Sequence, residues 1–124
     1  MKALSIRPDY AYLIMIGDKT REYRSWSTNY RGPLLICSTA RKIKNTIPGH
    51  ALFVVDLKNV EKLADHDYAW IIDPIYSIYP FSVKGQQGLF NVDDDLIKKA
   101  PIEGSKDVDE INKWCDKYLE PLFV

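Results

Sequence analysis

The amino-acid sequence predicts an α+β, mainly β domain. We expect a small, closed or nearly closed barrel of about six strands, with one early helix and C-terminal helices. Short apolar runs recur through residues 3–92, separated by Gly, Pro, Asn and Asp, which favour turns. An apolar stripe at helical spacing follows residue 107. The 124 residues fit a single domain, 1–124, with its core at 3–92 and a helical extension at 93–124.

A strand and a short helix are predicted at the start of the chain. Residues 3–6 form the first apolar run and predict the strand. Pro8 is tolerated in the first turn of a helix, and the acidic Asp9 suits the helix dipole there. Residues 11–16 are continuously apolar, which fits a buried helix or a buried strand. The Pro-Asp start and the stop at Gly17 favour the helix.

The other strands are predicted from short apolar runs between turn signals. They are expected at residues 20–26, 33–39, 50–57, 68–72, 75–79, 81–83 and 89–92. The dipeptide Asp73-Pro74 separates two of them, and the polar segment 58–67 is expected to contain a turn of helix. The segment Lys84–Gly88 is a glycine-framed loop, which is either a simple hairpin turn or the rim of a ligand site.

Two helical pieces are predicted at the C-terminal end. Three aspartates, 93–95, are expected to cap a short helix at 96–100. Asp107, followed by Glu110, starts a second helix in the manner of a capping box. We expect Trp114 and Tyr118 to pack in the core. The apolar stripe of the second helix comprises Val108, Ile111, Trp114, Cys115, Tyr118 and Leu119.

Composition excludes several classes of protein. No apolar run approaches the ~18 residues of a membrane helix. The amino terminus also lacks the pattern of a secretory signal, because Arg7, Pro8 and Asp9 interrupt its apolar residues. Cys37 and Cys115 lack the spacing of metal ligands, and so do His50 and His66. We therefore expect a cytoplasmic protein with two reduced thiols, and with no metal, cofactor or membrane partner.

Charge is distributed unevenly along the chain. Residues 1–50 hold nine Lys or Arg and three acidic residues, a net charge of +6, whereas the remainder has a net charge of −6. All five arginines precede Lys42, and aromatic residues are interleaved with them. Arginine beside aromatic side chains suits a groove for phosphates and unstacked bases. The alternative is that the two halves of the chain do not correspond to two faces of the fold, in which case these counts indicate no binding surface.

The stretch from Gly17 to Trp26 concentrates the charges. If residues 20–26 form a strand, Glu22, Arg24 and Trp26 share one face with Thr20, and the other face carries Lys19, Arg21, Tyr23 and Ser25. Neither face is plainly apolar. After Asp18, this stretch contains three cations and a single acidic residue, Glu22. We therefore expect Glu22 to pair with Arg24 or Lys19. Positive charge then remains for an anionic ligand.

These residues resemble the ASCH domain, a branch of the PUA-like superfamily. Gly17, Lys19, Glu22 and Arg24 match its Gly-x-Lys-x-x-Glu-x-Arg signature. Further similar segments are Leu4-Ser5-Ile6-Arg7-Pro8, Ser25-Trp26, Tyr30 to Ile36, Tyr68-Ala69-Trp70 and Val83 to Phe90. The resemblance implies a small β-barrel with a helix beside a cleft lined by the signature strand. It also implies ties to nucleic acid, since members of the family have been linked to RNA binding and to transcriptional coactivation.

Some small bacterial members of that family are amidohydrolases of N4-acetylcytidine and similar nucleobases. They use a lysine, a threonine three residues later and a glutamate. Lys19 matches the lysine, but Glu22 occupies the threonine position. Other hydroxyls nearby in the sequence are Thr20, Ser25, Ser38 and Thr39.

Three functions remain open. The first is a module that binds single-stranded RNA or a nucleotide-like ligand. Its candidate residues are Arg7, Lys19, Arg21, Arg24, Trp26, Tyr30, Arg31, Lys84, Gln86 and Gln87. The second is a hydrolase of N-acylated nucleosides or RNA that uses Lys19, Glu22 and Arg24. On an N-acylated nucleoside, Lys19 would activate a nearby hydroxyl as the nucleophile. On RNA, Glu22 would act as base and Arg24 would stabilise the developing charge. The third is a protein-interaction module, docking a partner through the acidic C-terminal third.

Overall fold

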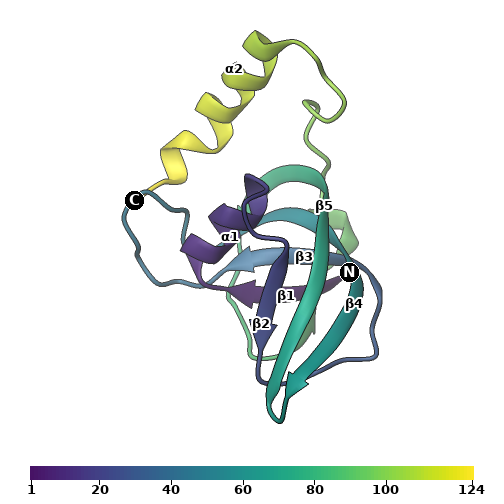
Figure 1. Cartoon of the computed structure of the whole chain (residues 1–124). Coiled ribbons are helices and arrows are strands. Elements are labelled where there is room, and N and C mark those ends of the chain that lie inside the picture. The colour runs from purple at the N-terminus through teal and green to yellow at the C-terminus, as the bar shows by residue number, and fades with distance from the viewer.

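One six-stranded sheet organises the fold (Figure 1), and the computed structural model describes all residues, 1–124. The strand order is β2-β5-β4-β3-β1-β6, in which β1 and β3 are parallel and all other neighbours are antiparallel. The strands are β1 (Lys2–Ile6), β2 (Arg21–Arg24), β3 (Gly32–Ser38), β4 (His50–Ala64), β5 (Asp67–Ser82) and β6 (Leu89–Asn91). The mainly β prediction is confirmed. The sheet is not closed, because the edge strands β2 and β6 do not pair with each other.

Helix α1 (Pro8–Met15) confirms the predicted early helix. Pro8 lies in its first turn with Asp9, and the chain turns at Gly17, whose φ of 86° suits a residue without Cβ. Parallel strands need a long crossover between them, and here α1 and β2 lie within the connection from β1 to β3. The helix therefore leads directly into β2, the strand of the charged signature (Figure 1).

The two longest strands differ from the prediction. β4 continues through Ala64, so the turn of helix expected at 58–67 is wrong, and the strands expected at 68–72, 75–79 and 81–83 are one strand, β5. Val54 lies opposite Tyr76 but Val55 lies opposite Pro74, so the separation expected at Asp73-Pro74 is a β-bulge within one continuous strand. Pro is accommodated at such irregularities. Hydrogen bonding to the partner strand thus overrides the local polarity and the proline.

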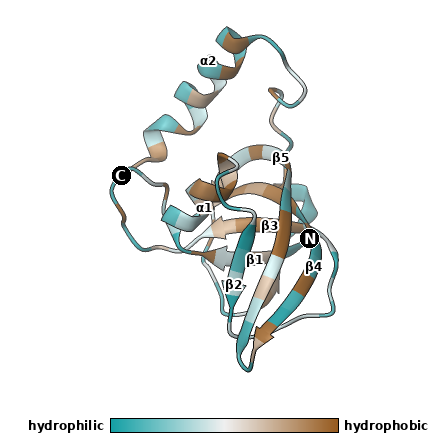
Figure 2. Cartoon of the chain, viewed as in Figure 1, coloured by the Kyte–Doolittle hydropathy of each residue, from teal (hydrophilic) through white to brown (hydrophobic).

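Both faces of the sheet contribute to the core. Leu34 and Ile36 of β3 belong to one hydrophobic cluster, and Leu35 and Cys37 belong to another. This alternation explains the continuous apolar run in β3, since a strand covered on both faces has no polar side. Figure 2 shows β3 and much of β5 as hydrophobic, whereas β2 is hydrophilic. The signature strand is therefore a polar edge of the sheet.

The short helix predicted at 96–100 is wrong. A 3₁₀-helix, η1 (Asp94–Leu96), is capped by Asp93, whose side chain accepts a hydrogen bond from the Asp95 N–H at 3.0 Å. The following residues are extended, and Lys99 forms a β-bridge with Ile78 of β5. Hydrogen bonds with β5 thus replace those of the expected helix.

Helix α2 (Val108–Tyr118) begins where the sequence predicts it. The Asp107 carboxylate accepts hydrogen bonds from the N–H groups of Asp109 and Glu110. Trp114, which is 6% exposed, packs with Tyr118 and with Tyr79 of β5, their ring centroids lying 5.3 and 5.6 Å from its own. The expected packing roles of Trp114 and Tyr118 are confirmed.

The chain end returns to the sheet domain after α2 and the 3₁₀-helix η2 (Glu120–Leu122). Val124 exchanges backbone hydrogen bonds with Asn45 and Thr46, and the Phe123 ring lies 6.3 Å from Tyr12 of α1. Figure 1 shows α2 standing beyond the sheet, with the C-terminus beside the long loop that precedes β4. The helical extension is thus held at both of its ends.

The two cysteines are free thiols, as expected. Cys37 is buried in β3, and burial raises the pKa of its thiol to about 12. Neither helix is long and apolar enough to cross a membrane.

Candidate nucleic-acid-binding cleft

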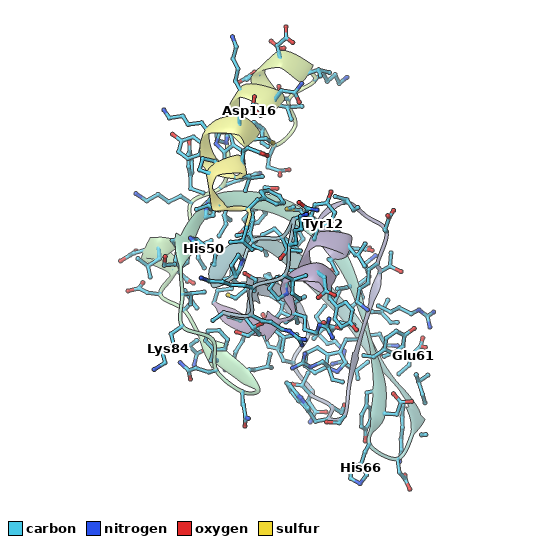
Figure 3. The ribbon with its side chains drawn as sticks, turned by 90° about the vertical axis from the view of Figure 1, so that its left-hand side faces the viewer. Tyr12, His50, Glu61, His66, Lys84 and Asp116 are labelled. Atoms are coloured by element: carbon cyan, nitrogen blue, oxygen red, sulfur yellow. The ribbon has the colours of Figure 1, made fainter.

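A cleft of about 500 Å³ opens where β1, the end of β2, the segment after β3 and the loop before β6 meet. Pairing brings β1, the end of β3 and the loop before β6 together, because β1 lies between β3 and β6. Arg24 comes from β2 at the opposite edge of the sheet, so the sheet curves enough to bring both edges to one cleft. Figure 3 shows Lys84 on the side of the molecule away from Glu61 and His66 of the β4–β5 hairpin. The cleft is lined by Ser5, Arg24, Thr39, Ala40, Lys84, Gly85, Gln86 and Gln87.

Ser5 is the buried polar residue of the cleft. Its residue exposure is 9%, and its Oγ has no hydrogen-bond partner within the protein. The backbone at Gly85 lies against it, so that a Cβ at this position would lie 2.6 Å from Ser5 Oγ. A buried hydroxyl without a partner costs free energy unless another group satisfies it. Ser5 lines the cleft, but the Gly85 backbone covers its Oγ, so a bound ligand can supply that group only if the loop at Gly85 moves.

Two cations of the cleft are free of ion pairs. The ion pairs of the chain involve neither Arg24 nor Lys84. The Arg24 guanidinium lies 5.8 Å from the centre of the Trp26 ring, and Lys84 is exposed. Glu22 interacts with Arg24 electrostatically, but no carboxylate lies within ion-pair distance of Arg24 or Lys84, so the cleft presents positive charge beside Ser5.

Glu22 is a buried carboxylate on the same strand face as Arg24. It is 3% exposed and lies opposite Trp70 in the pairing of β2 with β5. Its Oε1 lies 3.8 Å from Lys19 Nζ and accepts a hydrogen bond from the Tyr23 N–H at 3.2 Å, whereas its Oε2 has no partner. Of the two pairings that the sequence allows, the structure forms the one with Lys19.

Burial raises the pKa of Glu22 above its ordinary value of 4.5, although Lys19, Arg24 and the Tyr23 N–H all favour the charged form. The folded state therefore holds this proton more tightly than the unfolded chain does. Loss of the Glu22 proton therefore adds a negative charge that interacts with Lys19 and Arg24.

The raised pKa predicts how stability changes with pH. As pH rises from 4.5 through the folded-state pKa of Glu22, the unfolded chain loses this proton first, so this group's contribution to the free energy of unfolding falls. Urea unfolding at a series of pH values should show that fall for the wild type. Glu22→Gln should remove this part of the pH dependence. If the two proteins follow parallel curves, Glu22 has an ordinary pKa.

Several residues predicted to bind nucleic acid lie outside this cleft. Arg7 forms an ion pair with Asp9 at 3.1 Å, at the start of α1. Arg21 lies 3.6 Å from Glu61 of β4, and Lys19 pairs with Glu22. These three cations already have carboxylate partners, which distinguishes them from Arg24 and Lys84.

The aromatic residues and Arg31 make contacts within the protein. The Trp26 ring packs edge-on against Trp70, with centroids 4.8 Å apart. The Tyr30 hydroxyl donates to the Pro33 carbonyl. Arg31 Nη1 donates to the carbonyls of Thr28 and Tyr30 at 2.8 Å, holding its own loop.

Sequence reasoning brought Arg24, Lys84, Gln86 and Gln87 into the candidate set, and the structure places all four in one cleft. It did not identify Ser5 as a binding residue, although Ser5 belongs to the first motif of the family resemblance. Thr39 appeared only as one of several hydroxyls. No local signal marks either residue, because their place in the cleft depends on strand pairing. No group of three or more His, Cys, Asp or Glu side chains could hold a metal ion.

Comparison with known proteins identifies the family. The family model described as ASCH domain matches residues 4–90, which covers every strand except the first two residues of β1 and the last of β6. Helix α2 and the C-terminal residues lie outside the match. A search of the curated proteins found no match. Because the family model covers well over half of the chain, and the fold is the mainly β one that the resemblance implied, this chain belongs to the ASCH domain family.

Proposed function

We propose that the chain binds RNA or a nucleotide-like ligand in the cleft that contains Ser5, Arg24 and Lys84. The observation that carries the proposal is a cleft lined by two cations, Arg24 and Lys84, that form no ion pair, with the unpartnered Ser5 Oγ buried in its wall. The ASCH domain is generally associated with RNA binding, which supports this choice of ligand.

The chemistry of the cleft suits a nucleotide. Arg24 offers a planar fork of donors that matches phosphate oxygens, and Lys84 offers a mobile point charge. The exposed amides of Gln86 and Gln87 can both donate and accept hydrogen bonds, as the edge of a base requires. A volume of about 500 Å³ falls in the ordinary range of small-molecule sites, ~300–1,000 Å³.

Binding of uridine 5′-monophosphate and of an eight-nucleotide oligouridylate, measured by calorimetry at several salt concentrations, tests the proposal. Arg24→Gln and Lys84→Gln should each weaken binding of both ligands. Each substitution should also flatten the salt dependence of oligonucleotide affinity by about 0.7 per lost phosphate contact.

The controls are Lys62→Gln, on the β4–β5 hairpin, and Lys113→Gln, on α2, both exposed and remote from Lys84 along the fold. They should change neither affinity nor salt slope. If they weaken binding as much as Lys84→Gln does, the ligand responds to the net charge of the protein and not to the cations of the cleft. If neither ligand binds at low salt, the proposed function is wrong.

Glu22 favours a second candidate function, the hydrolysis of an N-acylated nucleoside. A carboxylate with a raised pKa is a suitable general base, and Lys19 and Arg24 could stabilise the charge that develops on the acyl oxygen. Water would add to the acyl carbon while Glu22 took its proton, and Glu22 would then give that proton to the nitrogen as the C–N bond broke, releasing a carboxylic acid and the amine and restoring the carboxylate. Incubation with N4-acetylcytidine should then yield cytidine and acetate, and Glu22→Gln should abolish the yield. Absence of product with the wild type would rule this substrate out.

A further inference from the structure

A row of alternating cations and aromatic rings runs from the start of α1 to β2, the strand that also carries Arg24 of the cleft. The Arg7 guanidinium carbon lies 4.9 Å from the centre of the Tyr10 ring, and Lys19 Nζ lies 4.9 Å from the same ring. Lys19 Nζ also lies 5.1 Å from the centre of the Tyr23 ring. We call Arg7, Tyr10, Lys19 and Tyr23 the cation–aromatic row. It runs from the start of α1 to β2, two elements that are adjacent along the chain.

The two ends of the row are accessible, whereas its centre is covered. Tyr23 is 54% exposed and the Arg7 side chain is 44% exposed, but the Lys19 side chain is only 16% exposed. A hollow of about 230 Å³ adjoins the Tyr23 end, and it is lined by Asp18, Lys19, Thr20, Arg21 and Tyr23. The row thus offers a flat guanidinium at one end and a phenol ring at the other.

Two segments of the chain connect the row to the cleft. Ser5 of the cleft and Arg7 of the row are two residues apart where β1 leads into α1. Arg24 of the cleft directly follows Tyr23 of the row in β2, so their side chains lie on opposite faces of this edge strand. The buried Glu22 carboxylate interacts with both Lys19 and Arg24. A ligand that contacts both the row and the cleft must therefore pass around the edge of the sheet at β2, which only a strand of several nucleotides is long enough to do.

The row contributes no free charge. Arg7 is paired with Asp9 at 3.1 Å, and Lys19 lies 3.8 Å from Glu22. What it offers is planar surface, and both phenol rings and guanidinium planes stack on bases. Stacking is therefore the contribution to expect from the row, and phosphate attraction is the contribution to expect from the cleft.

We propose that the row is a stacking platform for the bases of a single-stranded oligonucleotide, one nucleotide of which occupies the cleft. The inference rests on the proposed function and makes it more specific, because it selects a strand of several nucleotides over a free mononucleotide. RNA and DNA share the phosphates and the base faces that this surface reads, so they are tested separately.

The test compares uridine 5′-monophosphate with oligouridylates of two, four and eight nucleotides, and thymidine 5′-monophosphate with the matching oligothymidylates. Affinity should rise with length in at least one series, and that series identifies the nucleic acid. Tyr23→Ala should lower the affinity of the eight-nucleotide strand at least about fivefold, the lower end of what loss of one stacked base costs. Tyr23→Phe should retain it. Neither variant should change mononucleotide affinity or the salt slope.

The matched control is Leu63→Ala, which shortens another exposed apolar side chain, 51% exposed, on the β4–β5 hairpin. A second control, Lys99→Ala, removes a cation that lies 5.5 Å from the Tyr76 ring on β5. Both should bind like the wild type. If mononucleotides bind but affinity does not rise with length, or Tyr23→Ala leaves strand affinity unchanged, the row is not a platform. If nothing binds, the proposed function fails with it.

Discussion

Replacing Trp70 with alanine is expected to destabilise the protein by about 3–5 kcal/mol, the usual cost of removing a large buried aromatic side chain. Trp70 is 0% exposed and belongs to the larger hydrophobic cluster. Its ring centroid lies 4.8 Å from that of Trp26, and its Nε1 donates to the Trp26 carbonyl at 3.2 Å. The substitution therefore leaves a cavity and also an unsatisfied carbonyl.

Trp70→Ala should also weaken ligand binding in the cleft. Trp70 lies opposite Glu22 where β5 pairs with β2, and Trp26 follows the strand end that carries Arg24. Trp70→Phe, which keeps an aromatic ring in place, should cost less than Trp70→Ala and should keep more of the ligand affinity.

Urea unfolding measures these free energies, and the control is Tyr23→Ala. Tyr23 also lies on β2 but is 54% exposed, so its replacement should change the free energy of unfolding by no more than about 0.5 kcal/mol. An equal loss in Tyr23→Ala and Trp70→Ala would mean that β2 is weakened by any substitution near it.

Replacing Gly85 with alanine is expected to destabilise the protein by about 1–3 kcal/mol and to abolish binding in the cleft. The added Cβ would lie 2.6 Å from Ser5 Oγ and 3.2 Å from Ser5 Cβ, so either the loop or β1 has to move. Ser5 lies within β1, whose neighbours on both sides are hydrogen-bonded strands. The loop is therefore the part that shifts, carrying Lys84 and Gln86 with it.

A double substitution tests whether the close contact between Ser5 and the added Cβ at position 85 causes the destabilisation. Ser5→Ala removes the hydroxyl oxygen, so Gly85→Ala should cost less stability in that background than in the wild type. Gln87→Ala, an exposed change in the same loop, is the control for stability and should have little effect on unfolding. If the two changes at 5 and 85 are strictly additive, the close contact between these positions does not govern the loop.

Much of the fold can be predicted from local pattern. The proline and acid at the start of α1, the Asp107 cap of α2 and the apolar run of β3 all act over a few residues, so the sequence alone indicates those elements. The signature around Glu22 also indicates the family and a paired, buried carboxylate. The hairpin of β4 and β5 could not be predicted in this way, because its polar residues and Pro74 are held extended by a partner strand.

The family, the mainly β class and the charged signature can be predicted from the sequence, because each depends on residue types at short spacing. The sequence does not show that Glu22 pairs with Lys19, that Trp26 packs on Trp70, or that Ser5 and Gly85 meet in one cleft, and these contacts appear only in the folded structure. These contacts depend on which strands are neighbours and in what register. Strand order is set by the burial of apolar side chains distributed along the chain, and no short stretch of sequence carries that information.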